Sequence, residues 1–207
     1  MLQLLGRSTS INVRKVLWLC AELELPIVHE EWGSGDLSVR SDEFRTLNPN
    51  GLVPVIRDED FVLWESNAIC RYLAARHRRD DLLPVELRPR ALVEQWLDWQ
   101  TTELNTSWRY AFLALVRKTP TYTDPVAIEA STASWNRHMQ ILESQLQRTG
   151  AFVAGTHLTL ADIAIGLSTH RWFMTPIERP HLAAVEAFYE RLSMRPAFLK
   201  HGRNGLP

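Results

Sequence analysis

A proline close to the start of a short apolar segment is the feature of this chain that limits its fold most. The segment 52–56 reads Leu-Val-Pro-Val-Ile, with Pro54 in its middle. Because proline cannot donate a ladder hydrogen bond, a strand that contains one places it at its first positions or at a sheet edge. If the Val53–Pro54 peptide bond is cis, the N–H and C=O of Val53 become available beside the strand. An extended, peptide-like ligand could then pair with Val53 as an added strand.

The next predicted strand, 61–65, ends where a helix begins at Ser66. A helix N-terminus offers free N–H groups and the positive end of the helix dipole, so it can hold a carboxylate. Glu65 beside it supplies an acceptor for an ammonium group. One short region of the chain could therefore hold the backbone amide, the α-carboxylate and the α-amino group of a single ligand.

Composition limits the classes of function. The 207 residues suffice for one large domain or two small ones, and the net charge of −1 gives no reason to expect a nucleic acid or an anionic membrane as partner. No apolar run approaches the roughly 20 residues that cross a bilayer. The two cysteines, Cys20 and Cys70, form no CxxC pair, which excludes a thioredoxin-type dithiol and favours a reducing cytoplasm. No phosphate loop and no cluster at metal-ligand spacing is present, so no metal is expected.

Hydrophobic periodicity predicts the element order β-α-β-α-β-β-α for the first part of the chain. A β-α-β start implies two parallel strands with a right-handed crossover, and the three-residue connection 58–60 allows only an antiparallel hairpin. This order matches a thioredoxin-like domain. The predicted strands are 2–5, 27–32, 53–57 and 61–65, and the helices are one that ends before Pro26, one at 41–47 and one at 66–76.

The remainder of the chain is predicted to be all-α. We expect a thioredoxin-like domain at 1–78, a charged linker at 79–87 whose Leu pair packs on the second domain, and a helical domain at 88–207. Thr159 and Asp162 have the spacing of a capping box at the start of one helix, with Leu158 and Ile163 as its hydrophobic staple. The other predicted helices are 89–117, 125–149, 180–193 and 196–201.

Two strings resemble a known family. "LNPNGLVPVI…LWESNAICRYL" resembles the glutathione-binding half of the cytosolic glutathione transferases, and "LTLADIAI" resembles the start of their central C-terminal helix. The resemblance covers essentially the whole chain. It implies that Val53, before a cis Pro54, pairs with the cysteinyl backbone of glutathione, and that Glu65 and Ser66 hold its γ-glutamyl end. It also implies a homodimer with twofold symmetry.

The loop Arg7-Ser8-Thr9-Ser10-Ile11-Asn12 places hydroxyls at a helix N-terminus beside this ligand site. Hydroxyl donors and a positive dipole end both favour a thiolate, which is the nucleophilic form of a thiol. A free thiol has a pKa of about 8.5, and one hydrogen bond to a charged acceptor contributes about 1.5–3 kcal/mol. One Ser O–H and the dipole could thus leave most of a bound thiol ionised at neutral pH.

Ser10 matches the serine of the theta-, delta- and tau-like transferases, with Thr9 and then Ser8 as the alternatives. Asn12 corresponds to a second donor in a bacterial branch whose loop carries a Thr-x-Asn pair. The loop has no Tyr and position 10 has no Cys, so the chain departs from the tyrosine-using and beta classes. The hydroxyl residues could also serve only as turn and N-cap residues.

Two further groups of side chains complete the expected site. The family's usual lysine for the glycyl carboxylate of glutathione is Leu52 here, so Arg40 is the expected cation, with Arg45 and Arg7 as alternatives. The electrophile site is expected between the domains, at Trp108, Arg109 and Phe112. Tyr110, Trp172 and Phe173 are further candidates, whereas core or subunit contacts are expected for Trp96, Leu97, Trp99 and Leu104.

The leading hypothesis is a cytoplasmic glutathione transferase that uses glutathione as co-substrate and adds its thiolate to a small hydrophobic electrophile. A glutathione-dependent disulfide or peroxide reductase is the first alternative, since the Ser-x-Asn loop and the missing lysine favour it slightly. A non-catalytic module that binds glutathione or a protein is the second. A glutaredoxin-like oxidoreductase is disfavoured because the expected active-site cysteine is absent.

Overall fold

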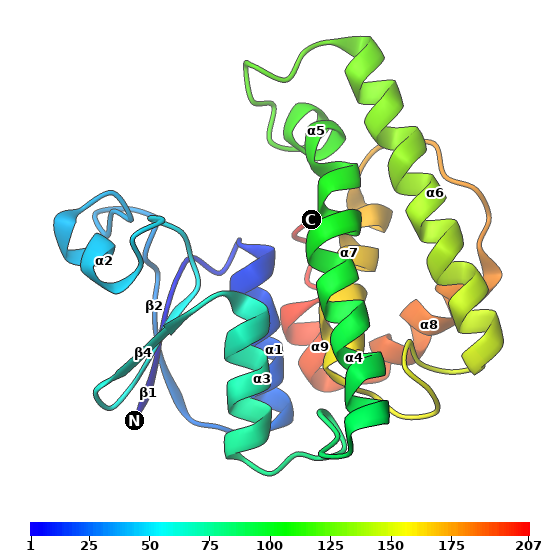
Figure 1. The fold of residues 1–207 in the computed structure, drawn as a ribbon. Helices are drawn as coiled ribbons and strands as arrows, with labels where there is room; N and C mark the ends of the chain where they lie inside the picture. Colours follow the sequence, from blue (N-terminus) through cyan, green and yellow to red (C-terminus); the bar gives the residue numbers. More distant parts are fainter.

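The computed structural model describes all 207 residues as a thioredoxin-like domain followed by a helical region (Figure 1). The strands are β1 (Leu2–Leu5), β2 (Ile27–Glu30), β3 (Val55–Asp58) and β4 (Phe61–Trp64). The helices of the first domain are α1 (Ile11–Glu22), α2 (Asp42–Leu47) and α3 (Ser66–Arg76). Those of the helical region are α4 (Leu87–Trp99), the π-helical η1 (Gln100–Leu104), α5 (Asn105–Leu115), α6 (Pro125–Thr149), α7 (Leu160–Met174), α8 (Ala183–Ser193) and α9 (Pro196–His201).

The four strands form one mixed sheet in the order β2-β1-β3-β4. β1 runs parallel to β2 and antiparallel to β3, and β3 and β4 form the expected hairpin. Neighbouring strand residues face opposite sides of the sheet: Leu4 joins the core formed with α1 and α3, whereas Leu5 packs with Phe44 of α2. Helices α1 and α3 therefore lie between the sheet and the helical region, with α2 on the other side (Figure 1). The thioredoxin-like fold is confirmed.

Several element boundaries differ from the predicted ones for local reasons. β2 ends at Glu30 because the N–H of Trp32 turns back to the Glu30 carbonyl (2.9 Å). β3 begins only at Val55, after the proline. The predicted helix 89–117 consists of α4, η1 and α5, and it ends early because the N–H of Arg117 bonds to the Phe112 carbonyl five residues back (3.1 Å).

Helix α7 is the centre of the helical region, and every residue from Leu160 to Trp172 is buried. Gly166 allows α1 to approach it closely. A Cβ at Gly166 would lie 3.2 Å from the Trp18 ring of α1 and 2.5 Å from Leu192 of α8. The largest apolar cluster consequently runs from the sheet through α1 and α3 into the helical region without a break.

The segment between α3 and α4 also packs on the helical region. Leu82 and Leu83 are both buried, and the Leu82 carbonyl accepts from the N–H of Leu160 at the start of α7 (3.0 Å). The linker predicted at 79–87 falls in this segment, and the domain boundary there stays a prediction. None of the helices is both long and apolar enough to span a membrane.

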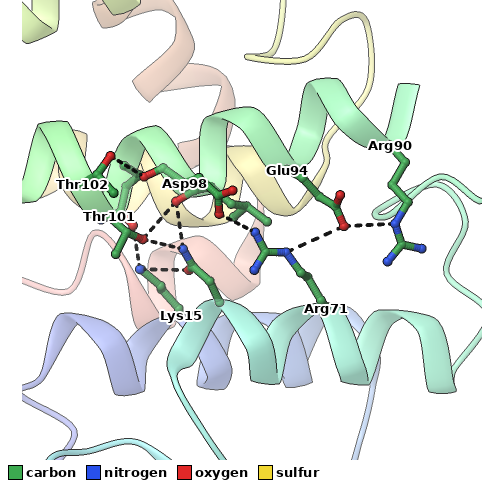
Figure 2. Close-up of polar contacts among 10 residues, drawn as sticks. Lys15, Arg71, Arg90, Glu94, Asp98, Thr101 and Thr102 are labelled. Carbon is green, nitrogen blue, oxygen red and sulfur yellow. Dashed lines mark hydrogen bonds and ion pairs between the residues drawn. The ribbon is translucent and has the colours of Figure 1, made fainter. Parts of the chain in front are cut away.

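Ion pairs lie along the outer side of the α3–α4 contact (Figure 2). Arg71 of α3 bonds to Asp98 of α4 (2.7 Å) and lies 3.9 Å from Glu94, which also pairs with Arg90 (3.0 Å). These side chains are partly exposed, and such pairs contribute about 0–1 kcal/mol each. They orient the two helices more than they stabilise the contact.

The predicted capping box at the start of α7 is confirmed. The fully buried Asp162 carboxylate accepts the Thr159 N–H (2.7 Å) and hydroxyl (2.9 Å), and its other oxygen accepts the N–H of Val153 (2.7 Å). Burial raises the pKa of Asp162 to about 6, although these hydrogen bonds act in the opposite direction. Asp162 therefore joins Val153, near the start of the α6–α7 loop, to the first turn of the central helix.

Replacing Asp162 with Ala should lower the free energy of unfolding by about 2–4 kcal/mol, because two buried N–H groups lose their acceptor at about 1–3 kcal/mol each. The matched control is Asp124→Ala, which removes the exposed N-cap of α6 and should cost about 1 kcal/mol or less. Urea unfolding of wild type, Asp162→Ala and Asp124→Ala measures the two losses of unfolding free energy. Equal losses for the two variants would contradict the role assigned to Asp162.

Candidate active site

The loop after β1 lies directly against the proline turn. Gly6 has φ 150°, and a Cβ there would lie 2.6 Å from a Val13 methyl and 2.9 Å from the Val53 Cβ. The Val53–Pro54 peptide bond is cis, and both sheet ladders of β3 begin only at Val55. The backbone N–H and C=O of Val53 have no hydrogen-bond partner within the chain. An extended ligand could therefore pair with Val53 beside the loop.

Glu65 has a backbone conformation that is rare for a side-chain-bearing residue, with φ 73° just before α3. Such conformations cost on the order of 1–3 kcal/mol and cluster at functional sites. Its side chain is exposed and forms no ion pair within the chain. Ser66, the first residue of α3, is buried at the helix N-terminus, where the first-turn N–H groups lack helical partners.

A buried lysine of α1, Lys15, lies beside this helix N-terminus (Figure 2). The Lys15 ammonium donates to Gln100 (2.8 Å) and Asn67 (3.1 Å) and lies 3.5 Å from the Ser66 hydroxyl. Gln100, in η1, donates in turn to Asn105 (2.8 Å). No carboxylate bonds to the ammonium, and burial lowers the pKa of Lys15 to about 8. The network connects the start of α3 with the start of α5.

A pocket of about 370 Å³ lies where the loop 7–12 meets α5 and α7. Ser10 is the N-cap residue of α1, but its side chain makes no capping hydrogen bond, so its hydroxyl is free to act on a ligand. The lining consists of polar residues of the loop, one face of α5 and several arginines: Arg7, Ser10, Ile11, Asn12, Asn105, Trp108, Arg109, Phe112, Leu113, Arg117 and Arg171. The chain has no group of His, Cys, Asp and Glu side chains that could hold a metal ion.

Comparison with known proteins identifies the family. The family model described as "Glutathione S-transferase, N-terminal domain" matches residues 9–76. Glutathione S-transferase GstB of Escherichia coli K12 is 38% identical over 207 residues, which cover 97% of each chain. The chain belongs to the cytosolic glutathione S-transferases.

Solved structures of glutathione transferases have the same fold over the full chain. A theta class glutathione S-transferase from Xanthomonas axonopodis pv. citri, solved with glutathione bound, superposes with a TM-score of 0.92 at 34% identity and covers 100% of this chain and 99% of its own. A delta-class glutathione transferase from Nilaparvata lugens gives a TM-score of 0.88 at 26% identity, with coverages of 100% and 95%.

The other hydroxyls of this transferase's first loop lie elsewhere. Thr9 does not line the pocket, and its carbonyl accepts from the Arg117 guanidinium (3.3 Å). Ser8 lines a different hollow, next to Cys20, and its N–H donates to Glu31 (2.9 Å). Of the three expected hydroxyl residues, only Ser10 lines the pocket, together with Asn12.

Arg40, the expected cation for the glycyl carboxylate, lies near Gly51, just before the proline turn. Arg40 is exposed in the loop before α2, and the carbonyl of the preceding Val39 would lie 3.1 Å from a Cβ on Gly51. Arg40 and the exposed Leu52 therefore flank the same edge of the proline turn. Of the alternatives, Arg45 is exposed on α2, and Arg7 lines the pocket while bonding to the Gly33 carbonyl (3.2 Å).

The three expected electrophile residues of α5 all line the pocket. Trp108 and Phe112 are buried with their rings edge to face at 5.4 Å, and Arg109 is exposed at the rim. Tyr110 faces away and packs on Tyr122 (4.9 Å), because residues two apart on a helix point in different directions. The core position expected for Trp96, Leu97 and Leu104 is also observed, while Trp99 is half-buried against Trp96.

The two candidates on α7, Trp172 and Phe173, do not line this pocket. Trp172 donates its indole N–H to Asn136 of α6 (2.9 Å), and Phe173 lines a hollow on another face with Arg179. The neighbouring Arg171 reaches the pocket instead, as does Arg117 after α5, and neither was expected. The signal for Arg171 is visible in the sequence as the one arginine of the largely apolar helix that follows the capping box.

The Lys15 pKa predicts how stability depends on pH. The folded-state pKa of about 8 lies below the ordinary 10.5, so between these values the unfolded chain binds more protons and stability rises with pH. The unfolding free energy of wild type minus that of Lys15→Met should therefore increase by up to about 3 kcal/mol from pH 7 to pH 10.5. Lys15 lowers the pKa of the Cys70 thiol, but burial holds the pKa of Cys70 and of Cys20 at about 12, so both thiols stay protonated in the folded state up to pH 10.5 and cancel in the difference. A flat difference would show that the ammonium is not penalised by burial.

Proposed function

We propose that this transferase binds glutathione along the proline turn and the start of α3, ionises its thiol at Ser10 and Asn12, and adds the thiolate to a small apolar electrophile. One observation carries the proposal: the free Ser10 hydroxyl and Asn12 line the same pocket as the Trp108 and Phe112 rings. Gly6 brings the loop that holds Ser10 against Val53. Thiol and electrophile would thus meet in one pocket.

Each end of glutathione has a group of matching chemistry. The Val53 backbone would pair with the cysteinyl residue, Glu65 would accept from the ammonium, and Ser66 with the free N–H groups of α3 would hold the α-carboxylate. Arg40 would hold the glycyl carboxylate beside Leu52, where it competes with solvent because it is exposed. Lys15 would keep the α3 N-terminus in place through Asn67.

The chemistry follows from the position of the thiol at the start of α1. A Ser10 O–H donated to the sulfur and the positive end of α1 both stabilise the thiolate, so the proton leaves to solvent before the reaction. The sulfur then attacks the electrophilic atom of a substrate packed on Trp108 and Phe112. Holding the two reactants together supplies the rest of the rate enhancement.

Ser10→Ala should raise the pKa of the bound glutathione thiol by about 1–2, because a hydrogen bond to a charged acceptor contributes about 1.5–3 kcal/mol. At pH 7 kcat/KM should fall roughly 10- to 100-fold, while the calorimetric affinity for glutathione changes little. Thr9→Ala is the matched control and should alter neither quantity, since Thr9 does not line the pocket. Thiolate absorbance and steady-state rates measure both. Unchanged activity in Ser10→Ala would favour a non-catalytic binding module.

We also propose a twofold-symmetric homodimer in the cytoplasm. β4 is an edge strand of the sheet, and Phe61 and Trp64 on it are 44% and 37% exposed, which leaves large apolar side chains uncovered at the edge. The two free, buried thiols suit a reducing compartment. Sedimentation at micromolar concentration should give twice the mass of one chain, and Trp64→Lys should shift the protein toward the single chain. A single-chain mass for the wild type would contradict the dimer.

A further inference from the structure

Arg171 is a buried cation without a partner. It is 3% exposed, its Nε is sealed from solvent without an acceptor, and it takes part in no ion pair. Its guanidinium stacks on the Phe112 ring (4.0 Å) and the Trp108 ring (4.6 Å), and it lines the pocket between the loop 7–12 and α5.

A second buried arginine shows how this chain treats such a group when the role is structural. Arg14 of α1 is 1% exposed and donates to three carbonyls, those of His201 (2.8 Å), Gly202 (3.0 Å) and Leu206 (2.6 Å). Every branch of its guanidinium has an acceptor, and it holds the C-terminal segment against α1. Arg171 has none of these acceptors, so its burial is not explained in the same way.

The charges around Arg171 are positive. Arg7, Arg109 and Arg117 line the same pocket, and no Asp or Glu does. Burial, Arg14 and Arg117 all lower the pKa of Arg171. The whole chain carries a net charge of only −1, so this concentration of arginines is local. A negative group entering the pocket would meet four guanidinium groups and no competing carboxylate.

The aromatic stack alone does not offset the cost of burying this charge. Cation–π contacts contribute about 0.5–2 kcal/mol, whereas an unpaired buried ion costs several kcal/mol even after relaxation. A guanidinium is also a preorganised fork for a carboxylate, to which it donates two parallel hydrogen bonds. Its position against two rings places such a carboxylate beside an apolar wall.

We propose that the second substrate of this transferase is an apolar electrophile that carries a carboxylate, with Arg171 as the residue that binds the acid and Arg117 as its support at the rim. The apolar body would lie on Trp108 and Phe112, and its electrophilic carbon would face Ser10 and Asn12. A pocket of about 370 Å³ suits a substrate of the size of a substituted benzoate. The inference rests on the proposed function and specifies its substrate class.

The reaction with such a substrate balances without a further reagent. With para-chloro-meta-nitrobenzoate, the thiolate sulfur attacks the ring carbon that carries chlorine, and the carbon–sulfur bond forms. The carbon–chlorine bond breaks and chloride leaves with the bonding electron pair. The thiol proton has already gone to solvent, and nothing is oxidised or reduced overall.

The test compares this acid with its amide, which has nearly the same shape and no charge. With glutathione saturating, kcat/KM divided by the uncatalysed rate constant should be at least about 10-fold higher for the acid in wild type. In Arg171→Met this acid-to-amide ratio should fall about 10- to 100-fold, the effect of one charge-assisted hydrogen-bonded pair. Arg171→Lys should keep part of the preference, and Arg179→Met, outside the pocket, should keep all of it.

A binding measurement separates this inference from the transferase mechanism. Calorimetry with the unreactive pair meta-nitrobenzoate and meta-nitrobenzamide should show the same preference in wild type and its loss in Arg171→Met. Acid-selective binding here, together with no turnover of para-chloro-meta-nitrobenzoate, would refute the transferase step and leave Arg171 only as a carboxylate-binding site. Circular dichroism and melting verify the fold, and if Arg171→Met does not fold, the exposed Arg117→Met carries the test with an expected loss of about 3- to 10-fold.

Several outcomes would overturn the inference. Equal binding of acid and amide by wild type would refute it, and so would an equal loss for both ligands in Arg171→Met, which would indicate a packing role. A raised KM for glutathione with an unchanged acid-to-amide ratio would assign Arg171 to a carboxylate of glutathione. A raised pKa of the bound thiol with an unchanged ratio would make it a thiolate-stabilising residue.

Discussion

The close packing of α1 against α7 is the contact on which the geometry of the pocket depends. Gly166 lets the Trp18 ring approach the central helix, and this fixes the axis of α1 between the sheet and the helical region. Because Ser10 and Asn12 lie at the first turn of α1, their distance from α5 follows from that packing. A side chain at position 166 would move the loop 7–12 relative to Trp108 without touching either.

Three buried cations of α1 and α7 have three different kinds of partner. Arg14 has three carbonyl acceptors and closes the C-terminal segment onto α1. Lys15 has neutral oxygen acceptors from both domains, which suits a compact ammonium with rotatable donors. Arg171 has only aromatic faces. The first two are satisfied within the chain, and the third is complete only when a ligand is present.

The sequence was most informative where local chemistry decides the structure. The order of strands and helices, the capping box at Asp162 and the proline turn all depend on residues a few positions apart, and the structure agrees with the prediction in each case. The π-helical segment η1 was not predicted, and its first residue, Gln100, accepts a hydrogen bond from Lys15, which is far away in the sequence. Helix periodicity alone cannot reveal such a contact.

The pocket was predictable in part for the same reason. Trp108, Arg109 and Phe112 follow one helix face, so one correct residue indicated the others. The α7 candidates do not line the pocket because a helix that is buried all round has no exposed polar face to show which side meets the pocket. The aromatic side chains of Trp172 and Phe173 therefore gave no information on their direction. The charge of Arg171 indicated the pocket better, because an arginine without an acceptor does not stabilise a buried helix.

The distribution of positive charge determines where this molecule can discriminate between ligands. Arg40, at the edge expected to bind the glycyl end of glutathione, is exposed, so water and salt weaken its attraction for a carboxylate. Arg171 is buried, and the lower dielectric constant around it makes the same attraction several times stronger. The planar guanidinium can donate two parallel hydrogen bonds to a carboxylate, which replace part of the water that the carboxylate loses on binding. Selection by charge is therefore strongest on the electrophile side of the site, beside the aromatic wall that selects by shape.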